Sequence, residues 1–394
     1  KLSTCMAISD LVDKLTDAID EKNYVIGVFI DLSKAFDTID HKILLNKLQL
    51  YGIRGTVWNW FKSYLENRTQ FVQIDSIKSK QLDVACGVPQ GSILGPLLFL
   101  IYINDLVNVS TLLNVIMFAD DTNLFLKDPN LNNLITLINQ ELTKISAWFK
   151  LNKLSLNIKK TNFILFHSKN KPVKPELQIQ IDNVPIIQVT KTKFLGVILD
   201  QSLSWTDHIT TVKQKVAKSL GIIYRVRKNL PKSVLITLYH ALIHPYLEYC
   251  NTVWAIHRSS TLNDLFISQK KSLRAITFSN WNSHTAPLFR SLNILPLSNI
   301  NDFHVCCYVY RSLNNLLPSH LSNMFVSNHC VHSYQTRNSQ NLHIQQYRLS
   351  LRKHTVRNFG SHLWNSIPEY LRKLPTYSLF KKTLKAYLLQ SSLN

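Results

Sequence analysis

The sequence predicts an α+β fold: an antiparallel sheet with helices on one face, followed by a mainly helical second half. Two apolar runs, Val115–Ala119 and Thr122–Leu126, flank a pair of aspartates and predict a β-hairpin. Apolar residues from Leu131 to Trp148 recur at the helical period. From Ser204 onward the pattern is mainly helical. A chain of 394 residues is too long for one core, so we expect two or three domains.

The first elements follow from the same periodicities. A helix is expected over residues 8–19, and the apolar run Tyr24–Ile30 predicts a buried strand. A second helix should begin after Asp40, a good N-cap residue, and end before Gly52. A third is expected over Trp58–Leu65. The segment before residue 66 is therefore helix, strand and two helices.

Short alternating segments follow. Gln70–Ile74 and Gln81–Ala85 predict a hairpin with a Lys-rich turn, and the glycine-punctuated stretch Gly87–Pro96 predicts a turn. Further strands are expected at Asn162–Phe166 and Phe194–Leu199. The turn at Gly87–Pro96 leads into a helix. We expect one stripe of this helix to be buried, and it is formed by Leu94, Leu97, Leu98 and Ile101.

Charge points to a polyanionic partner. The net charge is +21, and residues 169–394 carry +20 of it, because they hold 28 basic against 8 acidic residues. Clustered cations gain by neutralising phosphates, so nucleic acid is the first candidate. The segment Tyr347–His354 mixes cations with an aromatic ring and suits either nucleic-acid contact or a charged helix surface. Residues 327–346 are polar enough for a long loop.

The spacing of the cysteines predicts no disulfide framework. Six are present with no C-x-x-C pair, which is typical of a reducing compartment. A group of Cys and His residues downstream fits no usual zinc spacing: His304, Cys306, Cys307, His329, Cys330 and His332. The longest apolar run, Ile93–Ile103, is far shorter than the roughly 20 residues of a membrane span.

Three aspartates carry the chemistry. Asp31 closes the buried strand, and Asp120 and Asp121 occupy the hairpin tip 89 and 90 residues later. If these strand ends meet, their carboxylates form a cluster suited to two divalent ions that clamp the oxygens of a phosphoryl transfer. Without a cation such a cluster repels itself and its pKa values rise.

Three segments, in this order, resemble reverse transcriptases. Phe29–Asp37 resembles motif A, Gly87–Ser92 resembles motif B, and Phe118–Asp121 resembles motif C. The amino-acid sequences of these segments are similar to those of non-LTR retrotransposons of the jockey-like group. The similarity extends through Lys193–Val197 to Gly360–Pro368. The resemblance implies a right-hand polymerase palm, then a helical thumb and a basic helical C-terminal region.

The resemblance assigns roles residue by residue. Asp31 and Asp120 would bind two Mg²⁺ ions, for which Mn²⁺ can substitute, and Asp121 would complete the acidic set. Lys160, which matches a motif D lysine, would protonate the leaving pyrophosphate; its neighbour Lys159 is an acceptable alternative.

Nucleotide and primer contacts are implied in the same way. Phe36 would be the steric gate against a ribose 2′-hydroxyl, although core packing also explains this ring. The other nucleotide-site residues would be Leu32, Ala35, Gln90 and Gly91, and the primer grip would be Phe194, Leu195 and Gly196.

The expected function is RNA-directed DNA synthesis on an RNA template from a DNA primer and deoxynucleoside triphosphates. Only 30 residues precede Asp31, which implies an N-terminally truncated fragment and leaves open a catalytically inactive remnant that binds nucleic acid. Ala119 and Phe36 disfavour an RNA-dependent RNA polymerase. We expect domains at 1–203 (palm with a remnant of fingers), 204–295 (thumb) and 296–394 (basic region), no membrane association, and residence in nucleus and cytoplasm rather than secretion. The oligomeric state stays open.

Overall fold

The computed structural model describes residues 3–391 except 169, 170, 172, 174–176, 258 and 332–338. The chain divides into two compact units, one made of residues 22–190 and the other of residues 1–21 together with 191–394. We call them the sheet unit and the helical unit and describe each by itself. The predicted domain boundaries at 203 and 295 stay predictions.

The sheet unit is built on a five-stranded sheet in the order β13-β10-β1-β8-β7. All neighbours are antiparallel except β10 and β13, which run parallel, so the antiparallel prediction holds for four of the five strands. The strands are β1 (Tyr24–Ile30), β7 (Asn114–Phe118), β8 (Asp121–Asp128), β10 (Asn162–Phe166) and β13 (Ile187–Gln188).

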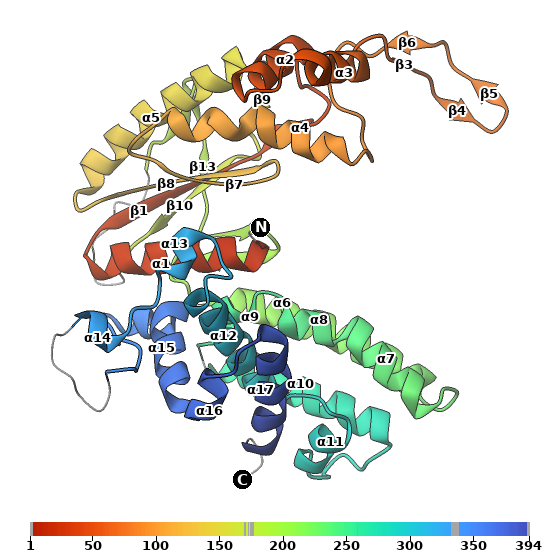
Figure 1. The fold of residues 1–394 in the computed structure, drawn as a ribbon, viewed down its shortest axis with the longest axis vertical. Coiled ribbons are helices and arrows are strands. Elements are labelled where there is room, and N and C mark those ends of the chain that lie inside the picture. The colour runs from red at the N-terminus through yellow and green to blue at the C-terminus, as the bar shows by residue number, and fades with distance from the viewer. Residues whose placement is uncertain are drawn as a thin grey trace. The chain divides into compact units, whose positions relative to one another are not determined.

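Strand β1 is central and buried along its whole length, as its apolar sequence predicts. Its residues alternate between the two faces, and Ile26, Val28 and Ile30 join the core under the helices. Helices α4 (Leu94–Ile103) and α5 (Leu131–Leu151) cover one face of the sheet, as predicted (Figure 1). Helix α2 (His41–Leu50) packs against α4, and α3 (Gly55–Leu65) packs against α2.

Capping residues fix several ends as predicted. The side chain of Asp40 accepts a hydrogen bond from the backbone N–H of Ile43 and caps α2. Gly52, just past α2, has φ +87°, a left-handed conformation that favours glycine. The segment after α3 is a long hairpin with two ladders, which projects from the helices (Figure 1). Its strands are β3 (Thr69–Gln70), β4 (Gln73–Ile74), β5 (Ile77–Lys78) and β6 (Leu82–Asp83).

Helix α4 corrects one prediction. Leu98 is buried as expected, but Leu97 is 50% exposed, and the buried face is completed by Phe99, Tyr102 and Ile103 instead. This helix is apolar all round, so its sequence shows no preferred face and the packing of neighbouring elements decides which side is buried.

The helical unit begins with α1 (Thr4–Asp20), the helix predicted over residues 8–19. It continues with a hairpin of β14 (Lys191–Phe194) and β15 (Val197–Asp200) and then with the predicted helices. The single strand predicted over Phe194–Leu199 is wrong, because Leu195 and Gly196 have positive φ and form the turn between these two strands. The main helices are α6 (Thr206–Val226), α7 (Lys232–Leu242), α8 (His244–Glu248), α9 (Asn251–Trp254), α10 (Ser260–Thr277), α11 (Ala286–Ser291), α12 (Leu297–Leu313), α15 (Val356–Ser366) and α17 (Tyr377–Ser391).

Two cations of the segment 347–354 are used inside the helical unit. The guanidinium of Arg352 lies 2.8 Å from the carboxylate of Asp17 on α1, and Arg348 donates its backbone N–H to Asp20 and its Nε–H to the carbonyl oxygen of Asp20. These contacts attach the segment to the first helix. The polar stretch 327–346 includes the short helix α14 (Asn328–Val331), and residues 332–338 lie outside the described part.

Within the described residues, no helix is long and apolar enough to cross a membrane.

Candidate active site

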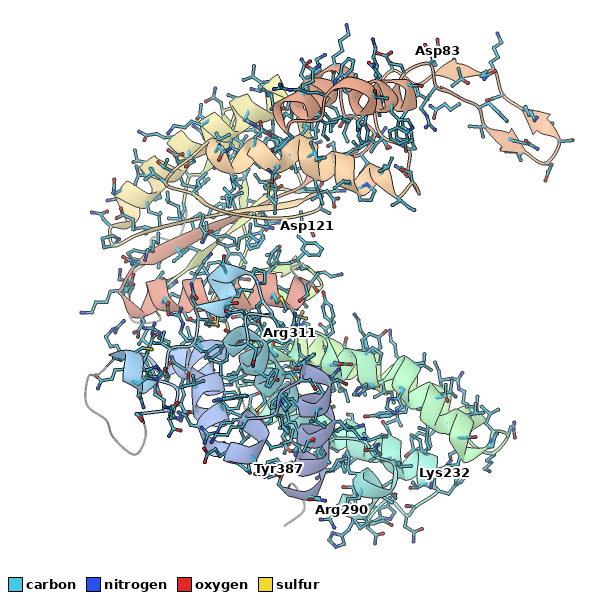
Figure 2. The ribbon with its side chains drawn as sticks, in the orientation of Figure 1. Asp83, Asp121, Lys232, Arg290, Arg311 and Tyr387 are labelled. Carbon is cyan, nitrogen blue, oxygen red and sulfur yellow. The ribbon has the colours of Figure 1, made fainter. Side chains whose placement is uncertain are left out.

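The sheet register brings the acidic residues together. Ile30, the last residue of β1, pairs with Thr122 of β8. Asp31 follows Ile30 and Asp121 precedes Thr122, so both aspartates lie next to this pair at the same end of the two strands. Asp120 occupies the two-residue loop of the β7–β8 hairpin, where Phe118 pairs with Asp121. The three carboxylates therefore gather at one end of the sheet, where Asp121 is labelled in Figure 2.

The hairpin loop holds a strained residue. Ala119 has φ +53°, a left-handed conformation that costs a residue with a Cβ roughly 1–2 kcal/mol. Two-residue hairpins demand positive φ in the loop because their twist must match that of the strands. The strain is placed directly before the paired aspartates, a position typical of functional sites.

The proximity of the three carboxylates affects the ionisation of Asp121. The pKa of Asp121 is raised, first by partial withdrawal of its carboxylate from water and then by the negative charges of Asp120 and Asp31. A cation would relieve this repulsion, and carboxylate oxygens are the ligands that Mg²⁺ prefers. Among the residues that the structure describes, no three His, Cys, Asp or Glu side chains are grouped closely enough to hold a metal ion. The oxygen donors of the three carboxylates fit a divalent ion by their chemistry.

Lys160 lies beside the cluster. Its ammonium is 3.9 Å from the carboxylate of Asp31, and its side chain is 73% exposed. The turn 157–161 positions it: Asn157 donates its backbone N–H to the carbonyl oxygen of Asp31, and the buried hydroxyl of Thr161 accepts the N–H of Asp31 at 3.4 Å. An exposed ion pair at this distance contributes little to the free energy of unfolding. The relevance of the contact is that it places the ammonium of Lys160 beside the carboxylate of Asp31.

Motif A continues past Asp31 into the core. Leu32 lies in β2 (Leu32–Ser33), which pairs with β9 (Ser155–Leu156), and Ala35 is buried. The half-buried ring of Phe36 packs against Phe99, with ring centroids 4.6 Å apart. Phe36 therefore has the packing role that its sequence allowed, and this packing also fixes the position of the ring.

The motif B loop is tied to motif A. The side-chain amide of Gln90 donates a 2.7 Å hydrogen bond to the carboxylate of Asp37. The backbone N–H of Gly87 donates to Ile39, and its carbonyl oxygen accepts from His41 at 2.7 Å. Gly91 is exposed with φ +79°. The loop is thus held by hydrogen bonds on one side and open on the other.

A cleft of about 840 Å³ adjoins this loop within the sheet unit. It is lined by motif A, the base of the β3–β6 hairpin, where Asp83 is labelled in Figure 2, and motif B. Lys34 and Arg68 bring two cations to its wall. Sequence reasoning missed Asp37, Lys34 and Arg68, although the first two lie inside the motif A segment. Arg68 stands 37 residues after Asp31 and gave no signal.

The predicted primer-grip residues form a tight turn in the helical unit. Leu195 and Gly196, with φ +43° and +82°, join Phe194 to its partner Val197. The hydroxyl of Tyr249 donates a 2.6 Å hydrogen bond to the carbonyl oxygen of Leu195. The turn is therefore fixed within its own unit.

Comparison with known proteins identifies the family. A family model described as reverse transcriptase (RNA-dependent DNA polymerase) matches residues 3–199. The chain belongs to the reverse transcriptase family. It is similar to the probable RNA-directed DNA polymerase from transposon X-element of Drosophila melanogaster, with 30% identity over 292 residues that cover 72% of this chain and 32% of that protein. The resemblance to non-LTR retrotransposon reverse transcriptases is thereby confirmed.

A second relative is the RNA-directed DNA polymerase from mobile element jockey of Drosophila melanogaster, which is 29% identical over 301 residues, covering 72% of this chain and 32% of that protein. The chain spans about a third of the length of these relatives. A solved structure of telomerase from Candida albicans with a fragment of telomeric RNA covers 74% of this chain and 48% of its own, at 13% identity. Its TM-score of 0.35 is too low to support an argument. Reverse transcriptases generally use divalent metal ions.

Proposed function

We propose that this reverse transcriptase chain carries the polymerase site of a non-LTR retrotransposon enzyme, an RNA-directed DNA polymerase that extends a DNA primer on an RNA template. The observation that supports this most is the pairing of Ile30 with Thr122, which places Asp31 and Asp121 at the same end of β1 and β8, with Asp120 in the adjoining loop and Lys160 3.9 Å from Asp31. An acidic cluster with one neighbouring cation is what nucleotidyl transfer needs, because charge develops on both the attacking and the leaving oxygens.

Asp31, Asp120 and Asp121 would hold two Mg²⁺ ions, or Mn²⁺ in their place. When bound, these ions supply charge neutralisation at phosphorus and favour loss of the proton of the primer 3′-hydroxyl. Lys160 would donate a proton to the departing pyrophosphate, and its exposed side chain leaves it room to reach that group. The hydrogen bond from the backbone N–H of Asn157 to the carbonyl oxygen of Asp31 attaches the turn 157–161, and so the backbone of Lys160, beside Asp31.

The cleft beside motif B would receive the deoxynucleoside triphosphate. Asp37 orients the amide of Gln90, and the bare backbone of Gly91 allows close approach. Lys34 and Arg68 would pair with phosphate oxygens, because charge-assisted hydrogen bonds are the strong ones.

Three further roles belong to the proposal. Phe36, held against Phe99, would exclude a ribose 2′-hydroxyl. Leu32 and Ala35 would line the same site, with the carbonyl of Leu32 as an added oxygen ligand. The turn of Phe194, Leu195 and Gly196 would contact the primer.

The test is Mg²⁺-dependent primer extension by the purified chain on poly-rA with oligo-dT, run beside Asp120→Ala. Incorporation by the parent and none by the variant is the expected result. Extension that survives the substitution would refute the assigned site.

One observation favours a second function, nucleic-acid binding without catalysis. Residues 169–394 carry a net charge of +20, so they can bind phosphates whatever the state of the carboxylates. Salt-sensitive RNA binding that is equal in the parent and in Asp120→Ala, with no incorporation by either, would make this the better description.

A further inference from the structure

Two thiols of the helical unit lie in contact although 245 residues separate them in the sequence. Cys5 is in the first turn of α1, and Cys250 joins α8 to α9. Their sulfur atoms are 2.9 Å apart, and both cysteines are free thiols. A disulfide has an S–S distance of about 2.05 Å, so less than about 1 Å of approach separates this pair from a bond.

The corner that carries Cys250 is fixed by hydrogen bonds. Cys250 itself has φ +51°, a conformation that a non-glycine residue adopts only when its surroundings demand it. The side-chain amide of Asn251 donates to the carbonyl oxygen of Leu247, and that of the buried Asn301 donates to the carbonyl oxygen of Asn251 at 2.8 Å. These hydrogen bonds fix the backbone on either side of Cys250, so its sulfur has a defined position beside that of Cys5.

The two sulfur atoms differ in access. Cys250 is 1% exposed, whereas Cys5 is half-buried. Both line a cavity of about 400 Å³ within the helical unit, together with Glu248, His304 and Arg311, the last of which is labelled in Figure 2. A small polar molecule can therefore reach this cavity and meet Cys5 before Cys250.

Ionisation follows the same asymmetry. The pKa of Cys5 is lowered, mainly by its hydrogen bond with the Cys250 thiol and in smaller part by the charge of His304. Burial acts in the opposite direction and raises this pKa. The same hydrogen bond and burial raise the pKa of Cys250. His304 is itself held by Glu248, with its Nε2 3.0 Å from the carboxylate. The lowered pKa therefore belongs to the more accessible sulfur and the raised pKa to the buried one.

We propose that Cys5 and Cys250 are a reversible disulfide site that is oxidised by small hydroperoxides, with Cys5 as the attacking sulfur and Cys250 as the resolving one. The thiolate of Cys5 attacks the terminal peroxide oxygen, so an S–O bond forms and the O–O bond breaks. The leaving group takes up a proton and becomes water from hydrogen peroxide or an alcohol from an organic hydroperoxide. Cys5 is then a sulfenic acid.

The second step closes the bond. The sulfur of Cys250 attacks that of Cys5, the S–S bond forms, the S–O bond breaks, and the departing hydroxide leaves as water with the proton of Cys250. With hydrogen peroxide, the two thiols lose two protons and two electrons and two waters are produced. The bond ties α1 to the α8–α9 corner, and a thiol reductant reverses it.

The test is chemical and independent of polymerase activity. The full reduced chain is titrated with hydrogen peroxide, remaining thiols are alkylated, and peptides are analysed by mass spectrometry. The expected product is a Cys5–Cys250 linked peptide, two hydrogens lighter than the pair of thiol peptides and lost on reduction. Amide exchange of α1 should slow at least tenfold in the oxidised chain, because detachment of the helix then requires the bonded corner to open as well.

Variants sharpen the result. Cys5→Ser should abolish the linked peptide, whereas Cys330→Ser, which removes an exposed thiol of α14, should leave it unchanged. The proposal is overturned if, in a chain shown to be folded by circular dichroism, both Cys5 and Cys250 stay alkylatable at doses that oxidise Cys330. It is equally overturned if Cys5 is oxidised to the sulfinic acid while Cys250 remains a thiol. Both of these outcomes are measured on the parent chain, so they do not depend on whether a variant folds.

Discussion

Gly87 gives the sharpest structural test of the motif B loop. A Cβ built at this glycine lies 2.8 Å from the carbonyl oxygen of Asp37 and 3.0 Å from its Cα, contacts that real side chains do not make. Backbone atoms cannot swing aside as a side-chain end can, and Gly87 is hydrogen-bonded on both sides, to Ile39 and to His41. Gly87→Ala must therefore push Asp37 and the loop apart.

The loss of stability expected for Gly87→Ala has two parts, the cost of the backbone conformation and the cost of the steric clash, and Gly52→Ala is a control for the first. Gly87 and Gly52 both have φ +87°, but a Cβ at Gly52 meets nothing within 4 Å. Gly52→Ala should cost only the left-handed conformation, roughly 1–2 kcal/mol. Gly87→Ala should add an overpacking cost of about 1–3 kcal/mol to this.

The assay must report on the sheet unit alone, because a chain of two units need not unfold in one step. Amide exchange of β1, the central strand, meets this need. The parallel readout is the KM for the deoxynucleotide, which should rise in Gly87→Ala because the displaced Asp37 no longer orients Gln90. Equal effects of the two substitutions on exchange, within about 0.5 kcal/mol, would refute the reasoning.

Three further outcomes are expected. Phe36→Val should raise ribonucleotide incorporation relative to deoxynucleotide about tenfold in primer extension, and an unchanged ratio would contradict the gate. Lys160→Gln should slow single-turnover incorporation about 10²-fold, whereas Lys159→Gln should stay near the parent; the reverse order would transfer the role to Lys159. Complete burial raises the pKa of Asp13 on α1 to about 7 despite the charge of Arg357, so the folded state favours the protonated acid. The protonated Asp13 therefore contributes fully to the free energy of unfolding below about pH 4, and this contribution is lost as the pH rises to about 7. At pH 8, urea unfolding should find Asp13→Asn more stable than the parent chain. Equal stability of the two chains would contradict this account.

The elements that could be predicted from sequence are those with a single dominant period. Strand β1, the β7–β8 hairpin and helix α5 follow from runs or alternations that no other structure explains equally well. Helix α4 could not be oriented, because a helix that is apolar on every side carries no signal for its buried face.

The candidate site residues could be named from the sequence, but the strand pairing around them could not. An alternation with a period of two residues places a side chain on one face of a sheet without identifying the partner strand, so the pairing of Ile30 with Thr122 beside Asp31 and Asp121 needed the structure. The contacts of Gln90 with Asp37 and of Lys160 with Asp31 join residues 53 and 129 positions apart, and no local preference encodes them.

The central place of β1 has a consequence for how copies of such a gene lose function. This strand is hydrogen-bonded on both sides, so its neighbours dictate its alignment and it cannot slide to absorb a missing residue. Loss of a single codon within 24–28 would turn the carboxylate of Asp31 to the opposite face, although all three motif segments would remain in the translated sequence. Such a chain would keep its three aspartates and lose their arrangement at the end of the sheet.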